Sequence, residues 1–229
     1  MARAAIASNC ANRLFGIGSG ESAMRRFSVA FVLFAFWASM AAQENNRPRA
    51  FDAIRSSDSY RQAVLGAYQE YESSLSTHCP KIDINMNTSE AKIYGTIETD
   101  ANGNIVNAHW KEMTDGVACG EKRSYAASVT IQNGKTAVLA LFPGQSAAGA
   151  VLQHDAVQYA AVGAGAGSCP VDVLETSLPN GEPGGPGVAW VEKWTVRACG
   201  KKSVVTIHFA PAAGGTTISV SPKETVAAS

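Results

Sequence analysis

The sequence predicts an α+β protein made as a tandem repeat of two units, each with one helix, a four-stranded antiparallel meander and one disulfide. Three observations predict this fold class. Blocks of residues recur along the chain, each copy holds a segment of helical period followed by alternating segments, and four cysteines stand at matched positions. The chain has 229 residues, 46% of them hydrophobic and 17% charged, which excludes a disordered chain and allows one large domain or two small ones.

The repeat is clearest around two Cys-Gly pairs. The matched blocks are Cys79-Pro80 with Cys169-Pro170, Trp110-Lys111-Glu112 with Trp190-Val191-Glu192, and Cys119-Gly120 with Cys199-Gly200. The tryptophan and Cys-Gly blocks are offset by 80 residues and the Cys-Pro blocks by 90. We infer duplication of a unit of 80–90 residues, with the first unit at 43–143 and the second at 144–229.

An export signal is predicted inside the chain. Arg25 and Arg26 follow Met24 and precede the apolar run Phe27–Trp37, and mostly small residues fill 38–42. This order is that of a secretory signal peptide, and the apolar run is too short for a membrane span, which needs about 20 residues. We therefore predict a signal peptide at 24–42 and a mis-called upstream extension at 1–23. The alternatives are a buried core helix and a long leader before the apolar run.

Cleavage would leave a mildly acidic exported chain. Residues 1–42 hold four arginines and one glutamate, so their removal takes the net charge from zero to −3. This charge argues against nucleic acid and against an anionic membrane as partners. No later segment has membrane length, so we expect no membrane span in the mature protein, which we place in the periplasm or outside a bacterial cell.

The first unit should open with a helix. Tyr60, Val64, Tyr68, Tyr71 and Leu75 follow one another at helical spacing. Ser57 or Asp58 can cap its start. Strands are expected at 91–99, 105–114, 124–132 and 136–142, and Asn133-Gly134 between the last two is typical of a hairpin turn.

The second unit should repeat this plan. Leu152, Ala156, Tyr159 and Val162 form the apolar stripe of its helix, and Gly163 is expected to end it. Strands are expected at 171–176, 188–198, 203–210 and 216–221. A long loop with several Pro and Gly residues, Pro179–Gly187, separates the first two of these strands.

The cysteines predict one disulfide in each unit. In a meander the start of the first strand lies beside the end of the second, which pairs Cys79 with Cys119 and Cys169 with Cys199. Such bridges stabilise each unit by roughly 3.5–4 kcal/mol. A four-cysteine zinc site is the alternative, but the sequence has no C-x-x-C cluster.

The candidate site residues are Trp110, Glu112, Trp190, Glu192 and Trp194. A carboxylate between tryptophans on an apolar strand face can have a raised pKa and act as an acid or base, and the tryptophans can line a binding groove. We favour a structural role, because Glu112 and Glu192 recur in both copies and one active site seldom needs duplicating. The chain has no H-E-x-x-H spacing and no G-x-S-x-G elbow, so no metal and no cofactor are expected.

The run W-x-E-x-W-x-V-x-x-C-G at Trp190–Gly200, followed by V-x-I-x-F and G-G-T-x-I, resembles a strand pattern in uncharacterised bacterial exported proteins. The resemblance covers about 30 residues per copy, and copy one departs from it at Met113, Thr114 and Asp115. It implies export and β structure, and it implies no activity.

The sequence therefore favours an exported, non-catalytic binding protein of the bacterial envelope, whose partner is a protein or another envelope component. One alternative is a secreted hydrolase that uses Glu112 or Glu192. A second is an inhibitor that docks into a target cleft through the Pro179–Gly187 loop.

Overall fold

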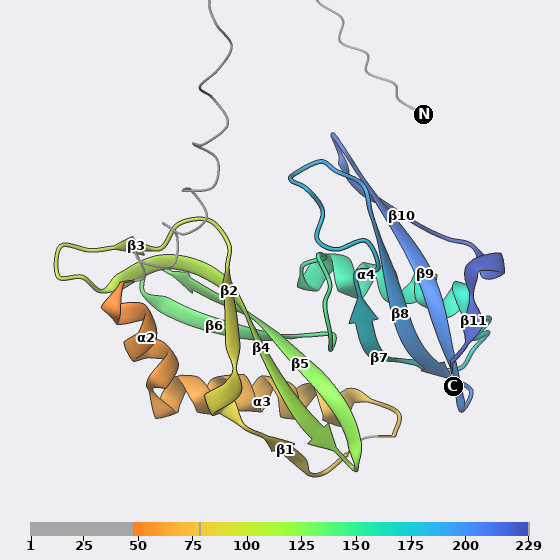
Figure 1. The fold of residues 1–229 in the computed structure, drawn as a ribbon, viewed down its shortest axis with the longest axis horizontal. Coiled ribbons are helices and arrows are strands. Elements are labelled where there is room, and N and C mark those ends of the chain that lie inside the picture. The colour runs from red at the N-terminus through yellow and green to blue at the C-terminus, as the bar shows by residue number, and fades with distance from the viewer. Residues whose placement is uncertain (1–47, 78, 229) are drawn as a thin grey trace, which may run out of the picture. The chain divides into compact units, whose positions relative to one another are not determined.

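Two antiparallel sheets, with helices packed against them, form the part of the chain that the computed structural model describes, residues 48–77 and 79–228 (Figure 1). The predicted upstream extension at 1–23 and signal peptide at 24–42 lie outside the described residues. The chain from Arg47 onward forms one compact unit that contains both sheets. The α+β class is therefore confirmed. Among the described residues, no helix has the length and apolar character needed to cross a membrane.

The first sheet is preceded by two helices, α2 (Arg49–Ser56) and α3 (Asp58–Ser74). The Oγ of Ser57 accepts a hydrogen bond from the backbone N–H of Tyr60, which is the predicted cap. The predicted apolar stripe of α3 is buried, from Tyr60 to Tyr71. The shorter α2 was not predicted, because it has only eight residues and Phe51 alone is buried on it, which is too little for a clear helical period.

Long strands β4 (Ile105–Ala118), β5 (Glu121–Gln132) and β6 (Lys135–Leu141) follow one another as predicted. The strand expected at 91–99 is instead divided into β2 (Glu90–Ile93) and β3 (Glu98–Thr99), which both pair with β4. A further short strand, β1 (Ile82–Ile84), also pairs with β4 and was not predicted. The 3₁₀-helix η2 (Met86–Thr88) separates β1 from β2, and Gly95, with φ of 74°, turns the chain after β2.

The second sheet is the predicted meander, with the strand order β7 (Val171–Ser177), β8 (Trp190–Ala198), β9 (Lys201–Ala212) and β10 (Gly215–Val220). The helix α4 (Ala150–Gly163) packs against it and ends at the expected glycine. A 3₁₀-helix η3 (Pro222–Glu224) then leads to β11 (Val226–Ala227), which pairs with β9 and was not predicted.

Both predicted disulfides are confirmed. Cys79 is bonded to Cys119 and Cys169 to Cys199, with Cα atoms 5.8 and 5.4 Å apart. Cys119 and Cys199 each occupy the first position of a two-residue turn, with φ of 48° and 51°, and a glycine of positive φ follows each. A turn with two left-handed residues fits the twist of an antiparallel hairpin, so the Cys-Gly pair both closes the hairpin and places the sulfur.

The link between the two sheets is bound to both of them. The N–H of Gly144 donates to the carbonyl of Ser124 on β5. At the outer edge of β7, the N–H of Gln145 donates to the carbonyl of Thr176, and the N–H of Thr176 donates to the carbonyl of Pro143. Phe142 lies 6.2 Å from the ring of Tyr71 and 5.3 Å from that of Trp194. Because Tyr71 and Trp194 belong to different cores, Phe142 joins the two cores.

Candidate functional site

Glu192 lies on β8 with no exposed surface, and its carboxylate accepts five hydrogen bonds. Trp190 Nε1 donates to Oε1 at 2.8 Å, and Trp194 Nε1 donates to Oε2 at 2.7 Å. The Oγ of Ser146 and the backbone N–H groups of Ala147 and Ala148 also donate to Oε1. Backbone and side-chain donors of this kind stabilise a buried carboxylate.

Glu112 occupies the same place on β4 and is equally buried, but its partners differ. Arg55 makes two hydrogen bonds to it, from Nη2 to Oε1 at 2.6 Å and from Nε to Oε2 at 3.0 Å. Tyr60 Oη donates at 2.6 Å and Trp110 Nε1 at 3.1 Å, both to Oε2. Burial alone would raise the pKa of Glu112, but the hydrogen bonds and the charge of Arg55 outweigh it, so the pKa lies below its usual range.

These contacts give both glutamates a structural role. Each ties its sheet to the segment that covers it, through α2 and α3 for Glu112 and through the link at 146–148 for Glu192. Neither carboxylate has exposed surface through which a substrate can reach it. A carboxylate that acts as an acid or base at neutral pH needs a raised pKa. Arg55 instead helps to lower the pKa of Glu112.

The tryptophans lie with the glutamates. Trp110 and Trp194 have no exposed surface, and Trp190 is half-buried and stacks on Phe209 at 4.8 Å. Trp110 and Trp194 are therefore core residues, in line with the favoured structural role. A partner that binds at the surface does not contact either of these two side chains. The predicted part of Trp190 in binding stays a prediction.

Lys111 links the two halves beside Glu192. Its Nζ donates to the carbonyl of Ser146 at 2.6 Å, while the hydroxyl of Ser146 donates to Glu192. Burial lowers the pKa of Lys111, and the charges of Glu182 and Glu192 partly oppose this effect. The serine is 2% exposed and its hydroxyl is already bonded to Glu192, so this Lys–Ser–Glu group has no open nucleophile.

A groove of about 1050 Å³ lies between the two sheets. One wall comes from β1 and the β4–β5 hairpin, and the other comes from β7, β8, β9 and β11. Polar and apolar surface contribute about equally to its lining, which carries both signs of charge. The charged residues in it are Asp83, Asp115, Glu121, Lys122, Arg123, Glu175 and Lys202.

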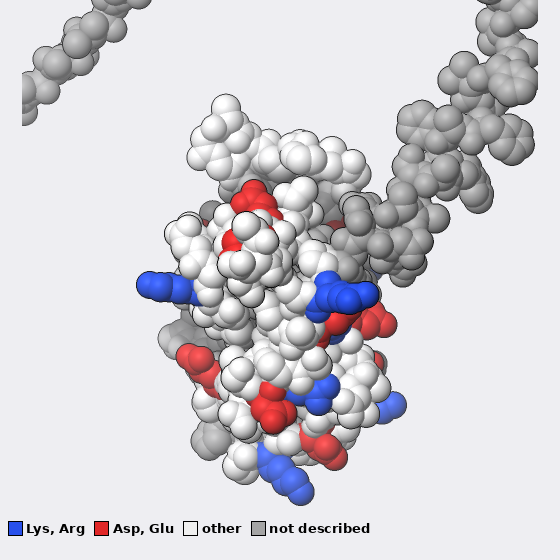
Figure 2. Space-filling view, turned by 90° about the vertical axis from the view of Figure 1, so that its left-hand side faces the viewer, with Lys and Arg blue, Asp and Glu red and all other residues white. Residues whose placement is uncertain are grey.

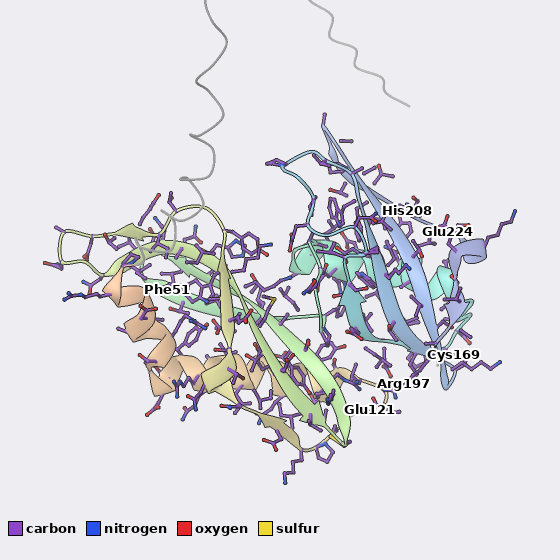
Figure 3. All side chains as sticks on the ribbon, viewed as in Figure 1. Phe51, Glu121, Cys169, Arg197, His208 and Glu224 are labelled. Carbon is purple, nitrogen blue, oxygen red and sulfur yellow. A yellow bond between two sulfur atoms is a disulfide. The ribbon has the colours of Figure 1, made fainter. Side chains whose placement is uncertain are left out.

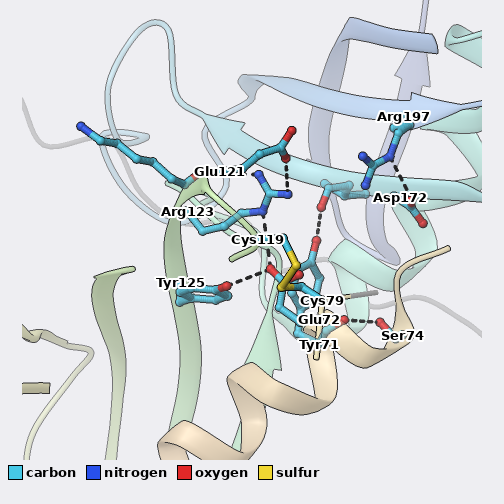
Figure 4. Close-up of polar contacts among 12 residues, drawn as sticks. Tyr71, Glu72, Ser74, Cys79, Cys119, Glu121, Arg123, Tyr125, Asp172 and Arg197 are labelled. Atoms are coloured by element: carbon cyan, nitrogen blue, oxygen red, sulfur yellow. Dashed lines mark hydrogen bonds and ion pairs between the residues drawn. A yellow bond between two sulfur atoms is a disulfide. The ribbon is translucent and has the colours of Figure 1, made fainter. Parts of the chain in front are cut away.

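A network of ion pairs and hydrogen bonds extends from this groove into the first core (Figure 4). Tyr125 Oη donates to Glu72 at 2.9 Å, and Arg123 lies between Glu72 and Glu121, at 3.5 and 2.7 Å. Lys202 on β9 then pairs with Glu121 at 3.0 Å. Hydrogen bonds from Arg123 and Lys202 lower the pKa of Glu121 to about 2. No sequence pattern indicated this network of contacts, because its members come from three elements far apart along the sequence.

Four charged groove residues form no ion pair in residues 48–77 and 79–228, namely Asp83, Asp115, Lys122 and Glu175. All four are exposed. They are therefore the charged side chains that a ligand in the groove meets first. Away from the groove, on the face drawn in Figure 2, positive and negative side chains are interspersed and neither sign forms a continuous patch.

The predicted docking loop Pro179–Gly187 is mostly exposed. Glu182 within it pairs with Lys92 of β2 at 2.6 Å, so the loop is attached to the first sheet at this point. Within residues 48–77 and 79–228, no group of three or more His, Cys, Asp or Glu side chains is arranged to hold a metal ion. His208 on β9 forms an exposed pair with Glu224 at 2.7 Å (Figure 3).

The chain matches no protein-family model, and comparisons with curated proteins and with solved structures found no match.

Proposed function

We propose that this protein is an exported, non-catalytic binding protein of the bacterial envelope and that it binds its partner in the groove between the two sheets. The single observation that carries the proposal is the groove itself, which is open to solvent, about 1050 Å³ in volume and lined from both halves of the chain. A hollow of this size at a junction of structural units is a common place for ligands.

The state of the two glutamates supports binding rather than hydrolysis. The hydrolase alternative depends on Glu112 and Glu192. Both carboxylates already accept hydrogen bonds from neighbouring side chains that hold them in place. Releasing either carboxylate for chemistry would leave buried donors without an acceptor, which costs about 1–3 kcal/mol for each group.

Two structural disulfides support export, because such bonds form and persist in oxidising compartments. The two sheets also support an origin by duplication. Glu112 lies opposite Ala127 and Glu192 lies opposite Ile207, so the two long hairpins have the same register at an offset of 80. In this proposal the groove arises where the two copies meet.

Site-specific photocrosslinking tests the proposal. A photoreactive amino acid replaces Lys122 or Glu175, which are exposed in the groove, and a matched control replaces Val151, which is 78% exposed on α4 and lies outside it. The full chain is expressed in a bacterium and irradiated in intact cells.

We expect one discrete crosslinked partner from both groove positions and none from position 151. Equal products from all three positions, or none from either groove position, would contradict binding in the groove. Retention of the chain in the cytoplasm would contradict export, and this outcome is read separately by cell fractionation.

A further inference from the structure

The edge strand of the first sheet, β6, has a neighbour on one side only within the described residues. It ends the strand order and pairs with β5. The two-residue turn at Asn133-Gly134 fixes which backbone groups point inward, so Lys135, Ala137 and Leu139 bond to β5. The N–H and C=O groups of the alternate residues, 136, 138 and 140, point away from the sheet, and no described residue bonds to them.

Beyond Lys135 at its start, β6 lacks most of the features by which proteins usually block an edge strand. Those features are charges, prolines, bulges and covering segments. Residues 136–141 include no charged residue and no proline, and their register with β5 has no break. Leu139 is 58% exposed on the sheet face away from α3. The free row ends at Phe142, whose N–H donates to Gln153 of α4 at 2.8 Å.

We propose that β6 pairs antiparallel with β6 of a second copy of this chain, which makes one continuous sheet across a two-fold axis. Centred on Val138, this register places Val138 opposite its own counterpart and Thr136 opposite Ala140. Each such pair forms two hydrogen bonds, so all the free outward groups gain partners. This proposal rests on the sheet edge and does not depend on the groove.

The side chains of β6 favour a second copy as the occupant. Leu139 comes opposite Ala137 of the second copy, which buries the exposed leucine. Lys135 comes opposite Leu141, so the two lysines lie at opposite ends of the pairing and do not repel each other. A symmetric contact of this kind is the commonest arrangement in soluble homo-oligomers.

The second sheet supplies an internal control. β10 is its edge strand and presents an equivalent outward row at 216, 218 and 220. However, the exposed side chains on the face of β10 that corresponds to Leu139 are Thr217 and Ser219. Ser219 stands at the position equivalent to Leu139, offset by 80 residues, and it offers no apolar surface to bury.

The test is sedimentation equilibrium over a wide range of concentration. Three variants of the full chain are compared with the parent, and far-UV circular dichroism verifies that each is folded. Leu139→Lys places a charge on the edge, and Thr136→Pro removes one outward N–H without touching the bonds to β5. Ser219→Lys places the same charge on β10 and is the matched control.

We expect the parent chain to form dimers, Leu139→Lys and Thr136→Pro to weaken dimerisation about tenfold or more, and Ser219→Lys to leave it within about twofold. A parent chain that stays monomeric up to roughly 1 mM would overturn the proposal. Equal weakening by Ser219→Lys would also overturn it, as would a dimer that neither β6 variant affects.

Discussion

Glu112 is the residue whose charge the structure depends on most directly. Its carboxylate accepts from Arg55, Tyr60 and Trp110 with no exposure to water. Replacing Glu112 by Gln leaves Arg55 without its counter-charge, and we expect a loss of about 3 kcal/mol in the free energy of unfolding. Urea unfolding at pH 7 measures this loss. Glu70→Gln, at an exposed position on the adjoining helix α3, is the control and should change it by less than about 0.5 kcal/mol.

The same carboxylate makes stability depend on pH. The pKa of Glu112 is lower in the folded protein than in the unfolded chain, where it is about 4.3. Its stabilisation is therefore fully present above the unfolded pKa and is lost as the pH falls through the folded pKa. Glu121, with a folded pKa of about 2, acts in the same direction between about pH 4 and 2. We expect the urea midpoint to fall between pH 5 and 3, and to fall less in Glu112→Gln. An equal fall in both proteins would contradict this assignment.

Single residues were the hardest part of the site to predict. The repeated W-x-E pattern located Glu112 and Glu192 and favoured a structural role, because the pattern is local. Their partners could not be predicted, since Arg55 lies 57 residues from Glu112 and Ser146 lies 46 residues from Glu192. No periodicity or spacing connects positions that meet only when a helix or a link folds over a sheet.

Among the elements, α3 and α4 offer a matched pair of glycines. An added Cβ at Gly163 would lie 2.5 Å from Cγ1 of Val205 on β9, whereas one at Gly66 on α3 meets nothing within 4 Å. Gly163→Ala must push α4 away from the sheet, and we expect it to destabilise the protein by about 1–3 kcal/mol. Gly66→Ala should stabilise it by roughly 0.5–1 kcal/mol. Thermal unfolding of the two variants measures both effects, and a stabilising Gly163→Ala would contradict the close packing.

The two hairpins closed by Cys-Gly turns allow a second test at this scale. The disulfides enclose 40 and 30 residues, so removing either one by paired Cys→Ala changes should cost roughly 3–4 kcal/mol. We expect the two losses to be similar, because the bridges hold equivalent strand pairs. Guanidinium unfolding of both double variants checks this, and a loss below about 1 kcal/mol for either pair would show that its hairpin is held by packing alone.

Elements with a strong local pattern were predicted well. Periodicity located α3 and α4, Asn133-Gly134 located a hairpin, and strand adjacency gave the cysteine pairing. The strand expected at 91–99 was mispredicted as continuous, because Gly95 interrupts it without removing its apolar residues. β11 was missed since two residues carry no alternation. Local sequence patterns thus predict long helices and strands. Short strands form only where a longer strand is available to pair with them, and no local pattern shows this.

At the scale of the whole molecule, the link residue Phe142 should decide whether the two halves unfold together. It packs against Tyr71 of the first core and Trp194 of the second, and the link that follows it is hydrogen-bonded to both sheets. Polar contacts also cross the junction, among them Tyr71 with Val173, Ser76 with Asp172 and Lys202 with Glu121. Phe142 is the apolar side chain that packs against both cores, and we expect it to couple their unfolding.

Calorimetry of Phe142→Ala tests this coupling. The parent chain should unfold in one transition, because its described part is one compact unit. The variant should lose about 3 kcal/mol and show two separated transitions, since each core keeps its own disulfide but loses its shared ring. Phe209→Ala is the control. It removes a ring that belongs to the second core alone, and it should lower the transition temperature without splitting the transition. A single transition in Phe142→Ala would show that the polar contacts across the junction suffice to couple the halves.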